Sequence, residues 1–416
     1  MVRYKGAIKE VVTLLSGSVL AQVITLVAYF VLLRIYSPAD YGLYTIFFSY
    51  IEVLVIVSTC KYEVGVVAAD NDHSAIALGR FALRLNYIVS LALLAVFSIL
   101  ATLGWLPGKF ARLGWLAILI SPMVFFIGNN RIFSAIYNRY HRYRAMATSD
   151  IVGASSGAVL KTLFGLLGMH SAGMPAGAVL GQASANINYR LGLRRIGLPY
   201  TTKAEEREAA RHQSNYPRYV APKDFISSFS ANLPFLWLAL YFDNAAVGLL
   251  AVATTFVIQP CNLIGGVFEK VIYARTAEAV REERPVVKDL ARFVIGMMLA
   301  ALLLAIVLWF FAEPLITLCF GNRWEGCGIY IRALLPWAVA VSGSLPLMFI
   351  PNIFGTQRTE LYIYLVQLIL RSGAILVGII ASDFLLAVRL FAAVSSLTAL
   401  SLTVWYLAQA ARRTSK

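Results

Sequence analysis

Charged side chains inside long apolar runs carry the most chemical information in this sequence. Glu52, Arg131, Lys161 and Arg371 each lie within an apolar stretch long enough to cross about 30 Å of hydrocarbon. A charge at the bilayer centre costs about 2.5–3.5 kcal/mol on insertion scales, so four such side chains facing lipid would cost about 10 kcal/mol or more. We therefore expect all four to face protein or water.

The three cations outnumber the one carboxylate. A structural interpretation pairs Glu52 with Lys161 or Arg131, which would hold neighbouring helices together. Glu52 cannot neutralise all three cations, and an excess of buried positive charge is typical of a path for an anionic substrate. Arg131, Lys161 and Arg371 are therefore predicted to bind substrate, since an arginine can hold phosphate oxygens through two N–H groups at once.

Two amides and the carboxylate complete the candidate site. Gln22 lies near the middle of the first apolar run, and Gln367 precedes Arg371 by one helical turn and so shares its face. We predict that both amides bind substrate. Glu52 is the only carboxylate near the middle of a predicted span, so we expect it to couple transport to an ion gradient.

The elements that hold these residues are predicted to be membrane-spanning helices. The 416 residues are 59% hydrophobic and 14% charged, with a mean hydropathy of +0.73, which leaves too little polar surface for a soluble globule. The sequence predicts about twelve spans. They are Val11–Leu33, Tyr41–Cys60, Leu85–Trp105, Trp115–Asn138, Ile151–Gly168, Ala172–Leu193, Phe225–Tyr241, Ala246–Val267, Phe293–Phe311, Gly328–Ile350, Leu361–Ala381 and Phe384–Ala408.

The turns between these spans indicate two halves. Ser37-Pro38-Ala39-Asp40 stops the first helix and caps the second, because Pro cannot continue a helix and an Asp oxygen accepts from free N–H groups. About half a chain later, Asp243 to Leu250 repeats a turn followed by Gly-Leu, as an internal duplication would. We therefore predict an all-α membrane protein with two six-helix lobes around a central cavity.

The longest loop separates the two predicted lobes. We assign residues 1–193 to an N-terminal lobe, 194–223 to a cytoplasmic linker and 224–416 to a C-terminal lobe. The charge-rich segment Lys203 to His212 in the linker is predicted to form a solvated helix against lipid headgroups.

Lys and Arg gather on one side of the predicted spans. Most of the 36 basic residues fall in segments that are cytoplasmic if the N-terminus is, so both ends are predicted to be cytoplasmic. Cationic inner loops beside anionic membrane lipids also account for the net charge of +15, so no nucleic-acid partner is expected.

Signatures of enzymes and metal sites are scarce. The sequence has no phosphate-binding glycine loop, zinc-protease motif, hydrolase elbow or Cys/His ligand spacing, so we expect no enzymatic activity, no cofactor and no metal site. Asp70-Asn71-Asp72 resembles the D-x-D of glycosyltransferases, but we predict that it caps a helix over Ser74–Arg84. Cys319 and Cys327 flank one predicted outer loop, and a disulfide between them is an open alternative.

Several short motifs resemble those of one transporter family. The opening of the chain and the connections after the fourth, ninth and tenth spans are similar to the polysaccharide-biosynthesis oligosaccharide flippases, the O-antigen translocase type of the multidrug, oligosaccharidyl-lipid and polysaccharide exporter superfamily. The matching motifs are Ser16-Gly17-Ser18 with Ala21-Gln22, Leu33 to Tyr44, Asn138 to Arg144, Phe320 to Trp324 with Leu334-Leu335-Pro336, and Gly355 to Arg358.

The resemblance implies a substrate as well as a fold. Members of this family move an undecaprenyl-pyrophosphate-linked oligosaccharide from the inner to the outer leaflet of the bacterial plasma membrane for O-antigen, capsule or exopolysaccharide synthesis, alongside a polysaccharide polymerase machinery. An ion-coupled multidrug exporter of the same superfamily is the first alternative, although a cavity for organic cations should carry more buried carboxylates than Glu52 alone. A glycan polymerase or glycosyltransferase is a weaker alternative, because the predicted outer loops are too short for a catalytic domain.

Overall fold

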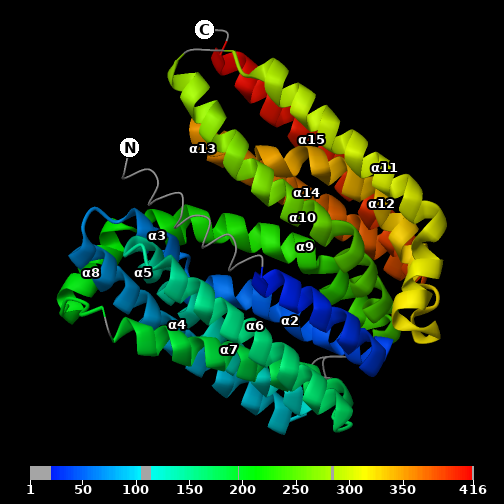
Figure 1. The fold of residues 1–416 in the computed structure, drawn as a ribbon, viewed down its shortest axis with the longest axis horizontal. Helices are drawn as coiled ribbons and strands as arrows, with labels where there is room; N and C mark the ends of the chain where they lie inside the picture. The colour runs from blue at the N-terminus through cyan, green and yellow to red at the C-terminus, as the bar shows by residue number, and fades with distance from the viewer. Residues whose placement is uncertain (1–19, 105–113, 195, 283–284, 415–416) are drawn as a thin grey trace. The chain divides into compact units, whose positions relative to one another are not determined.

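The chain folds entirely into helices over the residues that the structure describes. This computed structural model describes residues 20–104, 114–194, 196–282 and 285–414 (Figure 1). Residues 11–19 of the predicted first span, which include the Ser16-Gly17-Ser18 motif, lie outside the described residues. The chain divides into two compact units, Met1–Ser228 and Phe229–Lys416.

The first unit is a bundle of long helices with short helices at one end (Figure 1). It contains Leu20–Ile35, α2 (Pro38–Thr59), α3 (Tyr62–Ala68), α4 (Asp72–Thr102), η2 (Gly114–Leu119), α5 (Ile120–Arg139), α6 (Tyr143–Leu166), α7 (His170–Leu193), α8 (Lys203–His212), η3 (Tyr216–Val220) and the start of α9 (Ala221–Tyr241).

The second unit repeats this plan of long helices with short interruptions. It contains the rest of α9, then α10 (Asn244–Arg281), α11 (Val287–Phe320), η4 (Asn322–Trp324), α12 (Cys327–Ser344), η5 (Leu345–Leu347), α13 (Ile350–Phe354), α14 (Gln357–Ile380) and α15 (Phe384–Thr414). Within it, α12 packs against α10, α11 and α15.

Over the described residues, each predicted span coincides with a helix, so the prediction of an all-α membrane protein is confirmed. Eight described helices are both long and apolar enough to cross a membrane. The helices α6, α7 and α9 are less apolar, and Leu20–Ile35 is shorter. The predicted helix over Ser74–Arg84 and the predicted third span from Leu85 form one continuous helix, α4, which begins at Asp72.

Capping residues set where two of these helices begin, as predicted. The Ser37 hydroxyl accepts from the Asp40 N–H while the Asp40 carboxylate accepts from the Ser37 N–H, which forms a capping box at the start of α2. Asn71 accepts from the Ser74 N–H and caps α4, so Asp70-Asn71-Asp72 is a helix cap.

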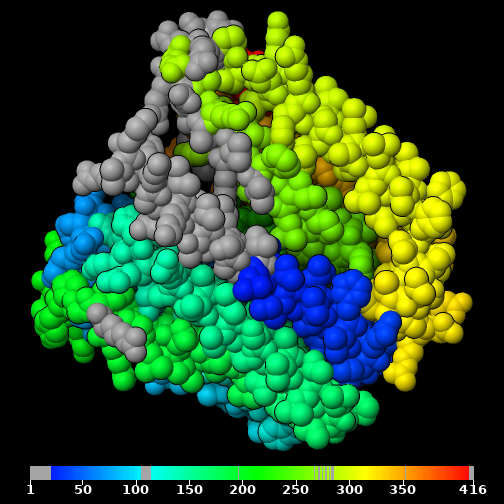
Figure 2. Space-filling view, viewed as in Figure 1, coloured from blue at the N-terminus to red at the C-terminus, as the bar shows by residue number. Residues whose placement is uncertain are grey.

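Lipid-facing character is clearest on α11. Its exposed large side chains are almost all apolar, among them Leu303, Phe310 and Leu318. The α11 segment forms much of the surface drawn in yellow in Figure 2. The predicted outer loop after it is shorter than expected, because α11 continues to Phe320 and includes Cys319. No disulfide joins the described cysteines, and the Cys327 thiol donates instead to the Leu249 carbonyl.

Glycines let α6 and α7 approach each other closely. Gly153 and Gly157 on α6 face Gly177 and Gly181 on α7, and these two helices have the most extensive contact of any pair in the described chain. A Cβ added at Gly181 would lie 2.6 Å from the Gly157 Cα. Spacings of four residues between small side chains are a common way for membrane helices to pack backbone against backbone.

We expect Gly181→Ala to destabilise the protein by about 1–3 kcal/mol, because the added methyl must push α6 and α7 apart. Gly373→Ala is the matched control, since a Cβ at this helical glycine of α14 would meet nothing within 4 Å, and it should stabilise by about 0.5–1 kcal/mol. Unfolding of the two variants in detergent would measure both effects, and equal stability of the two would contradict this account of the α6–α7 contact.

The predicted helix Lys203–His212 forms as α8, but solvent does not surround it. Glu206 is 1% exposed and lies 2.8 Å from Arg84 of α4. Its other carboxylate oxygen accepts from Thr201, whose hydroxyl also accepts from Arg80. The linker helix is therefore docked on α4, and the prediction of a simply solvated helix is wrong in this respect.

Removing the charge of Glu206 should loosen this docking. We expect Glu206→Gln to weaken it by about 1.5–3 kcal/mol, the usual contribution of a hydrogen bond to a charged group. Amide hydrogen exchange over 203–212 would then speed up by about tenfold or more. Glu208→Gln, which neutralises an exposed carboxylate on the same helix, should leave exchange unchanged. Equal exchange in both variants would show that Glu206 does not hold α8.

The start of α8 is sensitive to pH in a defined direction. The Glu205 carboxylate accepts from the Thr202 backbone N–H and hydroxyl, which lowers the pKa of Glu205. A lowered pKa in the folded state stabilises that state while the carboxylate is ionised. The contribution of the cap is therefore present at neutral pH and is lost as the pH falls through the lowered pKa.

Candidate functional site

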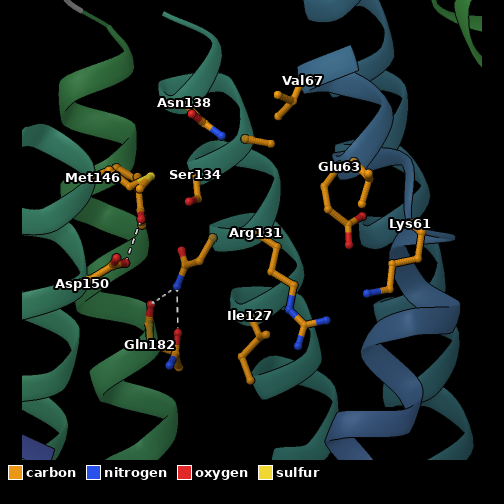
Figure 3. A pocket seen from close by; sticks show the side chains of 14 residues that line it. Lys61, Glu63, Val67, Ile127, Arg131, Ser134, Asn138, Met146, Asp150 and Gln182 are labelled. Atoms are coloured by element: carbon orange, nitrogen blue, oxygen red, sulfur yellow. Dashed lines mark hydrogen bonds between the residues drawn. The ribbon is translucent and has the colours of Figure 1, made fainter. Parts of the chain in front are cut away.

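A cavity of about 720 Å³ opens within the first unit, among α3, α5, α6 and α7 (Figure 3). This volume lies in the range of small-molecule sites, roughly 300–1,000 Å³. Its lining is Lys61, Glu63, Val64, Val67, Ile127, Asn130, Arg131, Ser134, Ala135, Asn138, Met146, Asp150, Gln182 and Tyr189. Charged and amide groups thus alternate with apolar ones around one space.

Helix α5 supplies the largest share of this lining. Ile127, Asn130, Arg131, Ser134 and Asn138 recur at spacings of one to four residues that bring them to one face of a helix. Arg131 is half-buried, and within the described residues it makes no ion pair. The predicted substrate-binding residue Arg131 therefore lines the cavity, and no described carboxylate forms an ion pair with it.

The break between α2 and α3 forms one side of the cavity. Cys60 and Lys61 both adopt positive φ, 47° and 60°, which ends α2 and starts α3 in a new direction. Lys61 then lies 2.8 Å from Asp224 of α9, while Glu63 is 8% exposed and one of its oxygens has no hydrogen-bond partner. Figure 3 shows Lys61 and Glu63 on the same side of α5 as the Arg131 guanidinium.

Helices α6 and α7 form the opposite side, which is uncharged except for Asp150 (Figure 3). Asn130 donates to the Gln182 side-chain oxygen at 2.9 Å and accepts from Asn186 at 3.0 Å. The Tyr189 hydroxyl donates to Asp150 at 2.8 Å. The cavity therefore has one side with the charged groups Lys61, Glu63 and Arg131, and one side of fixed hydrogen-bonding groups.

Lys161 and Glu52 lie outside this lining. The Lys161 ammonium approaches the Tyr44 hydroxyl at 3.4 Å and lies 5.3 Å from the centre of its ring. Tyr44 precedes Glu52 by eight residues on α2, about 12 Å along the helix axis. Glu52 is half-buried, and among the described residues it pairs with neither Lys161 nor Arg131, so the structural pairing considered from the sequence is wrong.

The two predicted residues of α14 lie buried in the second unit. Arg371 is 5% exposed, lies 5.5 Å from the Trp337 ring centre and 5.1 Å from that of Phe391, and donates to Ser230 at 3.1 Å. Within the described chain it has no carboxylate partner.

The two predicted amides differ in their surroundings. Gln367, on the same face of α14 as Arg371, is buried and donates to Thr398 at 3.1 Å. Gln22, by contrast, is exposed on Leu20–Ile35. The structure thus gives Gln367 a fixed partner and leaves Gln22 on the surface.

Sequence reasoning missed two carboxylates of the cavity. Glu63 and Asp150 lie just outside the predicted spans, Tyr41–Cys60 and Ile151–Gly168, and were therefore counted as loop residues. The expectation of one buried carboxylate against three cations is wrong for this reason. The available signal was that each lies within three residues of the end of a predicted span. Among the described residues, no group of three His, Cys, Asp or Glu side chains is placed to hold a metal ion.

Comparison with solved structures identifies the fold. An inward-facing multidrug resistance transporter of the MATE family, in the MOP superfamily, matches with a TM-score of 0.73 and 13% identity over 95% of this chain and 96% of that chain. The lipid II flippase MurJ in an inward closed conformation matches with a TM-score of 0.73 and 10% identity, over 96% of this chain and 87% of that chain. A MOP superfamily transporter from Pyrococcus furiosus matches with a TM-score of 0.64 and 14% identity, over 98% of this chain and 96% of that chain.

Comparison of sequences identifies the family. No curated protein gives a significant match. A family model described as "Polysaccharide biosynthesis protein" matches residues 31–328, which is most of the chain and agrees with the resemblance found in the short motifs. This multi-pass membrane protein, with the fold of MOP superfamily transporters, therefore belongs to the polysaccharide biosynthesis protein family.

Proposed function

We propose that this protein moves a polyprenyl-pyrophosphate-linked oligosaccharide from the inner to the outer leaflet of a bacterial plasma membrane. The observation that carries the proposal is Arg131, a guanidinium without an ion pair in a cavity of about 720 Å³. The lipid in the bacterial pathway is undecaprenyl pyrophosphate, and the product supplies the polymerase machinery of an O-antigen, a capsule or an exopolysaccharide.

The physical problem in this reaction is the pyrophosphate. Its charges lose their hydration when they cross about 30 Å of hydrocarbon, and a protein lowers that barrier by offering fixed cations and donors in a wet space. Arg131 supplies paired N–H groups for phosphate oxygens, as arginine commonly does. The lipid tail has no need of a site, since it remains soluble in the bilayer.

The other predicted residues enter the proposal in supporting roles. Lys161 and Arg371 would offer further cations along the path, with Gln22 and Gln367 as donors. Glu52 would couple transport to a proton or sodium gradient, because it is a half-buried carboxylate without an ion pair among the described residues.

Orientation gives this proposal a direct test. The distribution of Lys and Arg predicts that both ends of the chain and the α8 segment face the cytoplasm. Reporters fused after Arg144, within 203–212 and after Lys416 should all report a cytoplasmic location. An extracytoplasmic signal at any of the three would contradict this topology.

Complementation tests the function itself. A strain that lacks its oligosaccharide flippase should regain surface glycan when it expresses this chain, provided that the sugar repeat is accepted. Several host strains with different repeats should be used, with membrane levels of the protein measured in each. Absence of surface glycan in all hosts, at normal protein levels, would reject the proposal.

A second candidate is an exporter of organic cations, which the carboxylates Glu63 and Asp150 in the cavity favour. Such an exporter would lower cellular accumulation of ethidium and raise resistance to cationic drugs. Complementation of glycan export without any change in ethidium accumulation would leave the flippase as the function.

A further inference from the structure

We propose that Asp150 and Gln182 recognise hydroxyl groups of the sugar joined to the pyrophosphate, while Arg131 holds the pyrophosphate. This inference rests on the proposed function and adds the part of the substrate that the cations do not explain. The first step in the argument is that both side chains are fixed by neighbours on the cavity side drawn on the left in Figure 3.

A chain of amides fixes the Gln182 side chain. Asn186 donates to the Asn130 oxygen, and Asn130 donates to both the backbone and the side-chain oxygen of Gln182, at 3.0 and 2.9 Å. The oxygen of Gln182 is therefore occupied, and its NH₂ group is left as a donor. No partner for this NH₂ group lies among the described residues.

A tyrosine fixes Asp150 in a similar way. Tyr189 is 1% exposed, accepts from Tyr137 through its backbone carbonyl at 2.9 Å and donates its hydroxyl to one Asp150 oxygen at 2.8 Å. The second oxygen of Asp150 has no partner within the described part of the chain and remains an acceptor at the cavity surface.

A spare donor and a spare acceptor in one cavity suit a ligand whose groups both donate and accept. A sugar hydroxyl has this property, whereas an ionised phosphate oxygen only accepts. The Asp150 charge would repel phosphate, so this side of the cavity favours the uncharged, polyhydroxylated part of the substrate.

The cavity keeps these two preferences close together. Asn130 and Arg131 are consecutive on α5, and consecutive helical residues project about 100° apart. Asn130 fixes Gln182 on one side, while Arg131 points to the other (Figure 3). A pyrophosphate and the sugar bonded to it would therefore bind at the two sides of one cavity at the same time, in a space of about 720 Å³.

Binding of two lipids to the purified full-length protein tests this arrangement. The probes are undecaprenyl pyrophosphate and the same lipid carrying one hexose. We expect the wild type to bind the sugar-bearing lipid more tightly by about tenfold or more, because a hydrogen bond to a fixed charged group typically contributes that much.

Polarity swaps at the two positions give the sharpest variants. Asp150→Asn can still accept from Tyr189 but turns the spare acceptor into a donor, and Gln182→Glu can still accept from Asn130 but turns the spare donor into an acceptor. Each single variant should lose most of the preference for the sugar-bearing lipid, measured as the ratio of the two affinities, because the change of charge alters the binding of the pyrophosphate in both lipids alike. The double variant should recover part of the preference, because it again offers one donor and one acceptor.

Controls separate this inference from the proposed function. Ser149→Ala removes a contact with Asn188 that neighbours the cavity without lining it, and should keep the wild-type preference. Single variants that keep the full preference would overturn the inference and leave the flippase function standing. If Arg131→Ala binds neither lipid, the result would support the role of Arg131 in holding the pyrophosphate. If the wild type binds neither lipid, the result would reject the proposed function and the inference together.

Discussion

Arg131→Ala is expected to abolish glycan export at near-normal membrane levels of the protein. The guanidinium is the charged group of the cavity that lacks an ion pair and can still hold two phosphate oxygens. Without it, too few protein groups would replace the water molecules that the pyrophosphate loses, and the free-energy barrier to crossing the membrane would rise. Surface glycan in a complemented flippase-deficient strain is the measurement, with export reduced by about a hundredfold or more, since charge-assisted pairs contribute about 1.5–3 kcal/mol per hydrogen bond.

Two variants make this result interpretable. Arg131→Lys keeps the charge but loses the paired geometry, so it should recover only part of the export. Arg144→Ala removes the same charge from an exposed position of α6 outside the cavity lining and should export normally. Full export by Arg131→Ala at native expression would show that the pyrophosphate is handled elsewhere.

Arg371→Met is expected to fold normally and to lose export. The side chain is buried against Trp337 and Phe391 without a carboxylate partner in the described chain. Replacing a buried charge by an apolar group of similar length is often neutral or stabilising, so folding alone does not explain the presence of an arginine here. Unfolding in detergent should give stability equal to or above that of the wild type, while surface glycan falls at least tenfold.

The alternative outcome for Arg371 is equally definite. If the arginine serves only to pack between two rings, Arg371→Met should keep export, and Arg371→Lys should do so as well. Partial export by the lysine variant with none in the methionine variant would assign the function to the charge. Arg371→Ala is less informative, since it also leaves a cavity beside Trp337.

The fold was largely predictable because a run of apolar residues in the sequence is enough to indicate a membrane-spanning helix. Each apolar run became a helix, and Ser37 and Asn71 marked helix starts through hydrogen bonds to residues three positions away. The helices α4 and α11 extend beyond the predicted spans, because a helix continues past the apolar part of its sequence wherever other helices or water satisfy its polar groups. Local patterns do not record that continuation.

The candidate site was predictable only in part, because it depends on contacts between distant segments. Arg131 was found from its charge alone. Glu63 was missed because the helix break before it was not predicted. Cys60 and Lys61 adopt positive φ at this break, and neither is a glycine, the residue that usually indicates such a conformation in a sequence. The pairing of Glu52 with Lys161 was wrong, because Lys161 of α6 lies against Tyr44 of α2 instead. Which residue of α2 lies near Lys161 depends on the packing of distant segments.

The glycine contact between α6 and α7 also affects how this protein can evolve. Gly181 precedes Gln182, and Gly153 lies one turn after Asp150, so the residues proposed to read the sugar stand next to a backbone that hardly depends on side chains for its position. Substitutions at Asp150 or Gln182 can change what the cavity prefers without shifting the helices that carry them. On the proposed function, exchanges at these two positions would change which lipid-linked sugar is preferred, while the glycine contact keeps the two helices in place.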